Sequence, residues 1–125
     1  MNAPLPDSRP LILILEEEAH ERAALVEHLN GAGFAVLEAE DSDRALALID
    51  ETPEVKGVVS DAHVPGGIDG FELVQQVRRA RPDLAIVLMS GHSDDTSGPV
   101  PEGVAFINKP NLLEYLAPTL RRLIG

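Results

Sequence analysis

Four short apolar runs in this sequence each lead into a polar side chain that could do chemistry. A carboxylate can accept a phosphoryl group or bind a divalent cation, a hydroxyl can donate a hydrogen bond to phosphate, and an ammonium can balance phosphate charge. Together, such groups would suit a single site for phosphoryl transfer. The runs, with the polar residues that follow them, are 11–15 with Glu16, 58–60 with Asp61, 86–89 with Ser90 and 104–108 with Lys109.

The spacing of these runs predicts how their ends come together. A further apolar run at 34–37 is a plausible strand, and helical patterns of apolar residues fill the stretches between the runs. Alternating strands and helices favour a doubly wound α/β fold with a five-stranded parallel sheet. Because the carboxyl ends of parallel strands gather at one edge of such a sheet, the four polar positions are expected to meet there.

Local signals indicate where the helices begin and end. Asn30-Gly31 offers a stop for a helix that begins near Ala19, Ser42-Asp43 offers a start for the next, and a third begins near Gly70. Pro118 is expected to kink or split the last helix. That helix carries an apolar stripe, which could pack on the sheet or form a dimer face: Leu112, Leu113, Leu116, Leu120 and Leu123.

Length and composition indicate one domain behind a short flexible segment. The chain has 125 residues, close to the commonest domain size, and prolines interrupt its start, so we expect a flexible segment at 1–10 and one domain at 11–125. Without cysteine or an 18-residue apolar stretch, a disulfide framework and a membrane span are not expected. Acidic residues outnumber basic ones 21 to 10, and a formal charge of −11 repels nucleic-acid phosphates. We expect a cytoplasmic protein that binds no nucleic acid directly.

The order of the polar motifs resembles a known family. An acidic cluster follows the first strand, Asp61 is followed by Pro65 and Asp69-Gly70, Ser90-Gly91 follows the fourth strand, and Lys109-Pro110 follows the fifth. This order, from about Leu11 to Leu123, resembles the receiver domain of bacterial two-component response regulators. The resemblance implies a flavodoxin-like three-layer sandwich and a signalling protein rather than an enzyme.

The resemblance also assigns roles to individual residues. It implies that Asp61 accepts the phosphoryl group and that Mg²⁺ is held by Glu17, Asp61 and the backbone carbonyl of His63, with Glu16 acting through water. Lys109 would contact a phosphate oxygen. The resemblance implies that a proline after this lysine often has a cis peptide bond that orients the lysine, but the sequence does not show the isomer at Pro110.

Two more residues would form the switch of a receiver domain. The resemblance implies that Ser90 moves toward the phosphoryl group on activation and that Phe106, three residues before Lys109, is the switch aromatic. Ordinary core packing of Phe106 stays open as an alternative, because the run around it is apolar.

The sequence departs from the family pattern in three places. Glu16 and Glu17 stand where the family has two aspartates or glutamate then aspartate, and the extra methylene of Glu17 is expected to weaken or shift Mg²⁺. Gly66-Gly67 adds one residue to the loop after Asp61. Residues 94–103 contain two prolines and two glycines with almost no apolar periodicity, so the family's fourth helix is expected to be short or missing.

Each site residue also has an ordinary structural alternative. Residues 16–18 could be an acidic first helical turn, Asp61 could cap a turn, and Lys109 could be a surface lysine. Their joint occurrence in order favours a shared site. His63 and His92 could tune the lifetime of an acyl phosphate or be exposed without a role, and a transition-metal site built from them is disfavoured.

The sequence therefore predicts a stand-alone receiver domain that accepts a phosphoryl group on Asp61 from a histidine kinase or a phosphotransfer protein. Its output would be binding to a downstream protein or draining of phosphoryl groups from a pathway. The alternative is a degenerate receiver that acts as a phosphorylation-independent adaptor because Glu16 and Glu17 hold Mg²⁺ poorly. A flavin- or nucleotide-binding enzyme is disfavoured, since no phosphate-cradling glycine loop follows the first strand.

Overall fold

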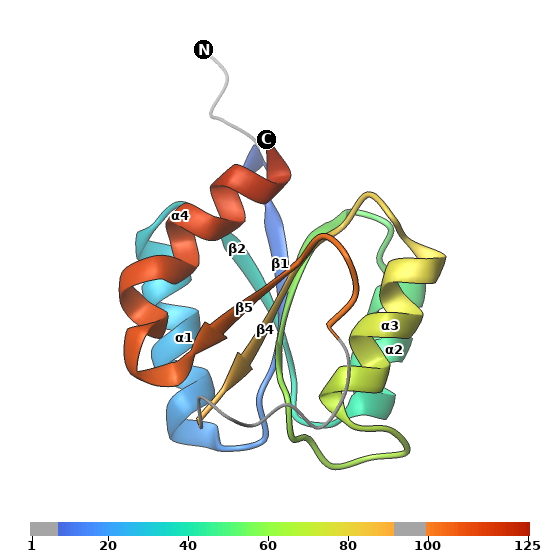
Figure 1. Ribbon diagram of the computed structural model, residues 1–125. Coiled ribbons are helices and arrows are strands. Elements are labelled where there is room, and N and C mark those ends of the chain that lie inside the picture. Colours follow the sequence, from blue (N-terminus) through green and yellow to red (C-terminus); the bar gives the residue numbers. More distant parts are fainter. Residues whose placement is uncertain (1–7, 92–99) are drawn as a thin grey trace.

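The computed structural model describes residues 8–91 and 100–125, and a five-stranded parallel sheet forms its centre (Figure 1). The strands lie in the order β2-β1-β3-β4-β5, and every neighbouring pair is parallel. The predicted doubly wound α/β architecture is therefore confirmed. The strands are β1 Leu11–Leu15, β2 Ala35–Ala39, β3 Val55–Asp61, β4 Ala85–Ser90 and β5 Val104–Asn108.

Helices cover both faces of the sheet (Figure 1). α1 (Ala19–Gly31) and α4 (Leu112–Ile124) pack on one face, and α2 (Ser42–Glu51) and α3 (Gly70–Ala80) pack on the other. In the described part of the chain, no helix is long and apolar enough to cross a membrane. The prediction about the family's fourth helix falls mainly on residues 92–99, which lie outside the described residues. The described residues around this gap, 91 and 100–103, contain no helix.

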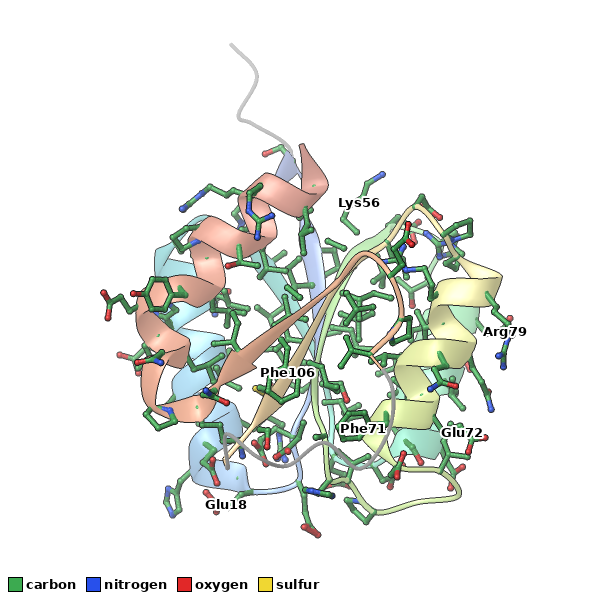
Figure 2. All side chains as sticks on the ribbon, in the orientation of Figure 1. Glu18, Lys56, Phe71, Glu72, Arg79 and Phe106 are labelled. Atoms are coloured by element: carbon green, nitrogen blue, oxygen red, sulfur yellow. The ribbon has the colours of Figure 1, made fainter. Side chains whose placement is uncertain are left out.

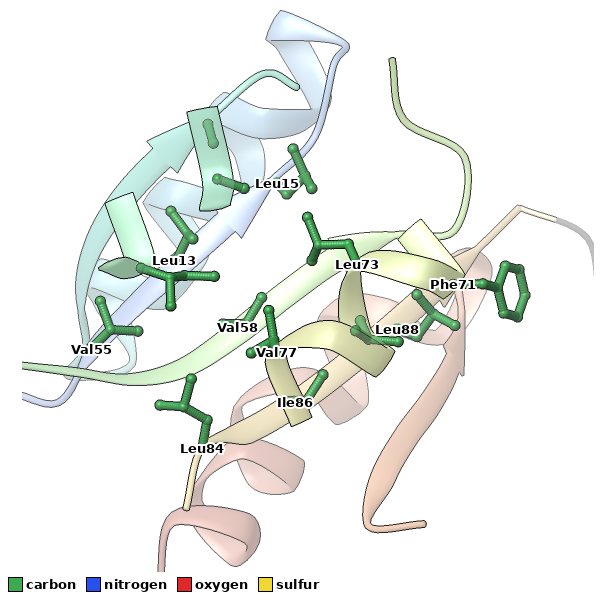
Figure 3. Packing of buried hydrophobic residues seen from close by; sticks show 14 of the residues in the cluster. Leu13, Leu15, Val55, Val58, Phe71, Leu73, Val77, Leu84, Ile86 and Leu88 are labelled. Atoms are coloured by element: carbon green, nitrogen blue, oxygen red, sulfur yellow. The ribbon is translucent and has the colours of Figure 1, made fainter. Parts of the chain in front are cut away.

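Strand alternation divides the buried side chains into two cores. In β1, Leu13 and Leu15 join the core under α2 and α3, whereas Ile12 and Ile14 join the core under α1 and α4. Figure 3 shows the first of these cores, where Leu13 and Leu15 lie with residues of β3, β4 and α3. Because both faces are covered, polar side chains of the central strands can reach solvent only at the strand ends.

Three helices begin at an acidic residue that accepts a backbone N–H of the first turn. Glu18 caps α1, Asp41 caps α2 and Asp69 caps α3, through hydrogen bonds of 2.8–2.9 Å. α2 begins at Ser42, but its cap lies one residue before the predicted Ser42-Asp43. Asp41 provides the cap, and the buried Ser42 hydroxyl instead accepts the N–H of Ile68 at 3.3 Å.

The last helix is not split at Pro118, which was one of the two predicted effects of this proline. α4 runs unbroken through Pro118. Pro118 lacks the N–H that would bond to the carbonyl group of Glu114, but both residues are on the exposed face of the helix, where water can reach that carbonyl group. Leu113 does not belong to the packed stripe, since its side chain is 52% exposed. Leu112, Leu116 and Leu120 are buried against the sheet as predicted.

The start of α3 is fixed by close packing of its first residue on the end of β3. The N–H of Gly70 donates to the carbonyl oxygen of Ala62 at 3.0 Å, and a side chain at Gly70 would collide with the carbonyl oxygen of Asp61. Gly31, at the end of α1, has open space where a Cβ atom would lie.

We expect Gly70→Ala to lower the free energy of unfolding by about 3 kcal/mol, because the backbone of Asp61 and Ala62 must shift to admit the methyl group. Chemical denaturation would measure this loss. Gly31→Ala is the matched control and should be neutral or slightly stabilising. An equal effect of the two substitutions would contradict the close packing described here.

Candidate functional site

The carboxyl edge of the sheet brings together polar residues that are far apart in the sequence. Asp61 ends β3, Ser90 ends β4, Glu16 follows β1 and Lys109 follows β5. The strand register aligns these ends, since Leu15 lies beside Ser60 and Ser90 beside Asn108. The sheet thus places side chains from four strand ends at one edge, as the sequence predicted.

The ammonium group of Lys109 is the centre of this edge. Its Nζ atom donates to Asp61 Oδ2 at 2.7 Å, to Glu21 Oε1 at 3.0 Å and to Glu16 Oε1 at 3.1 Å. An ammonium has three N–H donors, so the three carboxylates use all of them. Three ion pairs from three different elements therefore converge on one nitrogen.

The backbone holds the second oxygens of two of these carboxylates. Asp61 Oδ1 accepts the N–H of His63 at 3.2 Å, and Glu16 Oε2 accepts the N–H of Glu18 at 3.0 Å. Glu16 and Asp61 are both buried, and paired, hydrogen-bonded carboxylates are the form in which buried charge is tolerated. Both carboxylates are consequently fixed in orientation toward Lys109.

Burial and charge shift the pKa values of two groups in the cluster. Burial raises the pKa of the Glu16 carboxyl above its ordinary value, against the opposing effect of the hydrogen bonds from Glu18 and Lys109. Burial alone would lower the pKa of Lys109, but its hydrogen bonds to Asp61, Glu21 and Glu16 outweigh burial and raise that pKa. Lys109 is therefore a cation throughout the neutral range.

The predicted metal ligands divide into two groups. Glu16 and Asp61 both have an oxygen close to the same cation, and two carboxylates completed by water and phosphate oxygens suit Mg²⁺. The Glu17 side chain is exposed, and its carbonyl oxygen accepts from Arg22 at 3.3 Å. Among the described residues, no three His, Asp or Glu side chains gather as a ready-made metal cluster. The donor chemistry thus fits Mg²⁺ at Glu16 and Asp61, while the part of Glu17 stays a prediction.

The two predicted switch residues lie on neighbouring strands. Ser90 is fully buried at the end of β4. Phe106 in β5 is partly buried and packs against the core under α2 and α3 (Figure 2). This contact is what the core-packing alternative expected, and it leaves the switching role a prediction. His63 is exposed beside Asp61, and His92 lies outside the described residues.

The structure settles the isomer of the bond before Pro110, which the sequence left open: the bond is trans. No peptide bond in the described residues is cis, and Lys109–Asn111 forms a short 3₁₀ turn that leads directly into α4. Proline suits the first turn of a helix because its fixed φ is already helical and its missing N–H would have no helical partner there.

Sequence analysis missed Glu21, the third carboxylate on Lys109. Glu21 lies in the first turn of α1, three residues after the capping Glu18, to which it donates its backbone N–H. The acidic pair at a spacing of three resembles the pattern that marks helix starts, so the sequence could have placed Glu21 near the carboxyl edge of the sheet. It could not have shown that the side chain turns toward Lys109.

Comparison with known proteins identifies the family. A family model described as the response regulator receiver domain matches residues 12–117. The chain belongs to this family. A receiver protein from Sinorhizobium medicae WSM419 has the same fold, with a TM-score of 0.83, 25% identity and coverage of 94% of this chain and 95% of the other. The receiver domain of the hybrid histidine kinase CckA aligns with a TM-score of 0.76, 28% identity and coverage of 92% and 99%.

Curated relatives are much longer than this receiver domain. The sensor kinase CckA of Brucella abortus is 32% identical over 117 residues, which are 90% of this chain and 12% of the kinase. The C4-dicarboxylate transport transcriptional regulatory protein DctD of Pseudomonas aeruginosa is 32% identical over 127 aligned residues, covering 94% of this chain and 26% of DctD. The chain thus corresponds to one domain of proteins with different outputs.

We expect Lys109→Met to lower the free energy of unfolding by about 2 kcal/mol at neutral pH, because it leaves the buried Glu16 and Asp61 carboxylates facing each other without a cation. Denaturant titration would measure this loss. Lys56→Met is the matched control, since Lys56 is exposed at the opposite end of the sheet (Figure 2) and its removal should cost no more than about 0.5 kcal/mol. Similar losses for the two lysines would contradict the central position of Lys109.

Proposed function

We propose that this receiver domain accepts a phosphoryl group on Asp61 from a histidine kinase or a histidine phosphotransfer protein and signals through protein binding or drains phosphoryl groups from a pathway. The observation that carries the proposal is the 2.7 Å ion pair between Lys109 Nζ and Asp61 Oδ2 at the carboxyl edge of the sheet. In this contact a cation lies beside the carboxylate that we propose as the nucleophile. That is the arrangement that transfer of an anionic group requires.

The residues divide the chemistry between them. An Asp61 carboxylate oxygen attacks phosphorus and forms a P–O bond, while the bond from phosphorus to the donor's imidazole nitrogen breaks. The imidazole leaves with the bonding electrons and takes up a proton. Lys109 donates to a phosphoryl oxygen. The backbone N–H of His63, which donates to Asp61 Oδ1, orients the carboxylate.

Magnesium is the cofactor that this chemistry implies. Bound Mg²⁺ would neutralise part of the phosphoryl charge, and the residues that would hold it are Glu16 and Asp61, with Glu17 and the His63 carbonyl in the roles that the resemblance gives them. The similarity to part of the sensor kinase CckA supports a kinase as phosphoryl donor. The charge of −11 argues against direct contact with nucleic acid, and a cytoplasmic location and a possible homodimer belong to the same proposal.

A second function, that of a phosphorylation-independent adaptor, is favoured by one observation. Lys109 already forms an ion pair with each buried carboxylate of the site, and the exposed Glu17 stands where the family pattern has aspartate. A domain whose buried carboxylates already have a cationic partner could keep its fold and bind partners without metal or phosphate. The two functions differ in whether Asp61 takes up a phosphoryl group.

We expect the protein to gain one phosphoryl group when incubated with a small acyl phosphate donor and Mg²⁺, and to gain none without Mg²⁺ or after Asp61→Asn. Intact mass spectrometry measures this directly. Asp50 is an exposed aspartate on α2, away from the site. Asp50→Asn removes the same charge as Asp61→Asn and should leave phosphoryl uptake unchanged. If folded wild-type protein gains no phosphoryl group from the small donor or from the kinase of the same pathway, the result would favour the adaptor function.

A further inference from the structure

One carboxylate on Lys109 has no part in the phosphorylation chemistry proposed above. In the proposed function Asp61 is the acceptor, and Glu16 is its buried neighbour. Glu21 comes from the first turn of α1, and its carboxylate forms an ion pair with Lys109. Its Oε1 atom lies 3.0 Å from Lys109 Nζ, as close as Glu16 Oε1 at 3.1 Å. Glu21 therefore holds the third N–H of the ammonium.

A phosphoryl group that approaches Asp61 needs one of these N–H donors before the P–O bond forms, while the Asp61 carboxylate still accepts from Lys109. Lys109 has no fourth donor, so a phosphoryl oxygen can bind the ammonium only if a carboxylate gives up its hydrogen bond. The carboxylate that leaves determines how the site must rearrange.

Glu21 is the carboxylate that can leave most easily. Its side chain is 50% exposed, whereas those of Glu16 and Asp61 are 3% and 11% exposed. Glu16 and Asp61 each accept a backbone N–H with their second oxygen, which fixes them. Water can replace Lys109 as the partner of a half-exposed carboxylate, but it reaches the buried ones poorly.

The space beside the cluster allows this movement. A cavity of about 200 Å³ between α1 and α4 is lined by Glu21 and Lys109 together with Glu16 and apolar residues that include Leu112 and Leu113. The Glu21 side chain can turn toward this opening without disturbing the buried core. Charge acts in the same direction, because two anions bonded to one nitrogen would lie within about 6 Å of each other and repel.

We propose that Glu21 is a positioning residue that holds Lys109 by its third N–H, competes there with the incoming phosphoryl group, and so slows phosphoryl uptake at Asp61. This inference rests on the proposed function and adds a residue that sets its rate. The ion pair also keeps Lys109 directed at Asp61 before the donor arrives. Uptake then requires exchange of one hydrogen bond, from the Glu21 carboxylate to the phosphoryl oxygen.

The test is the rate of phosphoryl uptake by the full chain from a small acyl phosphate donor at subsaturating concentration, followed by intact mass. Glu21→Ala should raise this rate about two- to fivefold, the range expected for loss of one partly exposed ion pair. Glu21→Gln, which keeps size and removes charge, should give a smaller rise. Both gains should shrink at high salt, where charge repulsion is screened.

Glu27→Ala is the matched control, because Glu27 is an exposed glutamate of the same helix that lies two turns farther from the helix start. It removes the same charge and should leave the rate within experimental error of wild type. A variant that merely damaged the fold would lose rate, so a gain specific to position 21 supports the inference. An unchanged or slower rate for both Glu21 variants, in protein whose wild type is phosphorylated on Asp61, overturns it. If wild type and variants all fail to take up phosphate, the proposed function fails first and the inference with it.

Discussion

The structure of the site depends on one partly buried cation. Glu16 and Asp61 are carboxylates with little access to water, and burial of unpaired charge would be costly enough to unfold or reorganise the edge of the sheet. The ammonium of Lys109, 2.7 Å from Asp61 and 3.1 Å from Glu16, makes their burial tolerable. The same contact places a cation where an anionic group would be transferred. In the proposed function, the interaction that stabilises the site would also prepare its chemistry.

The rest of the fold serves to hold these three residues in reach of one another. Parallel pairing of β1, β3, β4 and β5 brings their carboxyl ends to one edge, and helices on both faces make that edge the place where polar groups of the central strands meet water. Close packing of Gly70 on the backbone of Asp61 fixes this residue from the other side. The same fold is found in another receiver protein, and the chain belongs to the receiver family.

Much of this could be predicted from sequence because the signals are local. Apolar runs located the five strands. Because a polar residue at the carboxyl end of a parallel strand lies at one edge of the sheet, the strand positions predicted where Asp61, Ser90 and Lys109 lie. What failed depends on side-chain direction or on competition between neighbours. Asp41 caps α2 in place of Ser42 because the Asp41 carboxylate accepts the N–H of Arg44. The Ser42 hydroxyl instead accepts the N–H of Ile68. The contact of Glu21 with Lys109 joins residues 88 positions apart and leaves no trace in either local pattern.

The most direct test of this account is the side-chain NMR signal of Lys109 in protein labelled with ¹⁵N at the lysine Nζ atoms. The chain contains two lysines, and Lys56, exposed at the far end of the sheet, is an internal reference. The account predicts a Lys109 ammonium signal at neutral pH that is protected from exchange with water and that shifts on Asp61→Asn, whereas the Lys56 signal is broadened by exchange. Equal exchange broadening of both lysines, or a Lys109 signal unchanged by Asp61→Asn, would contradict the three-carboxylate arrangement on which the site depends.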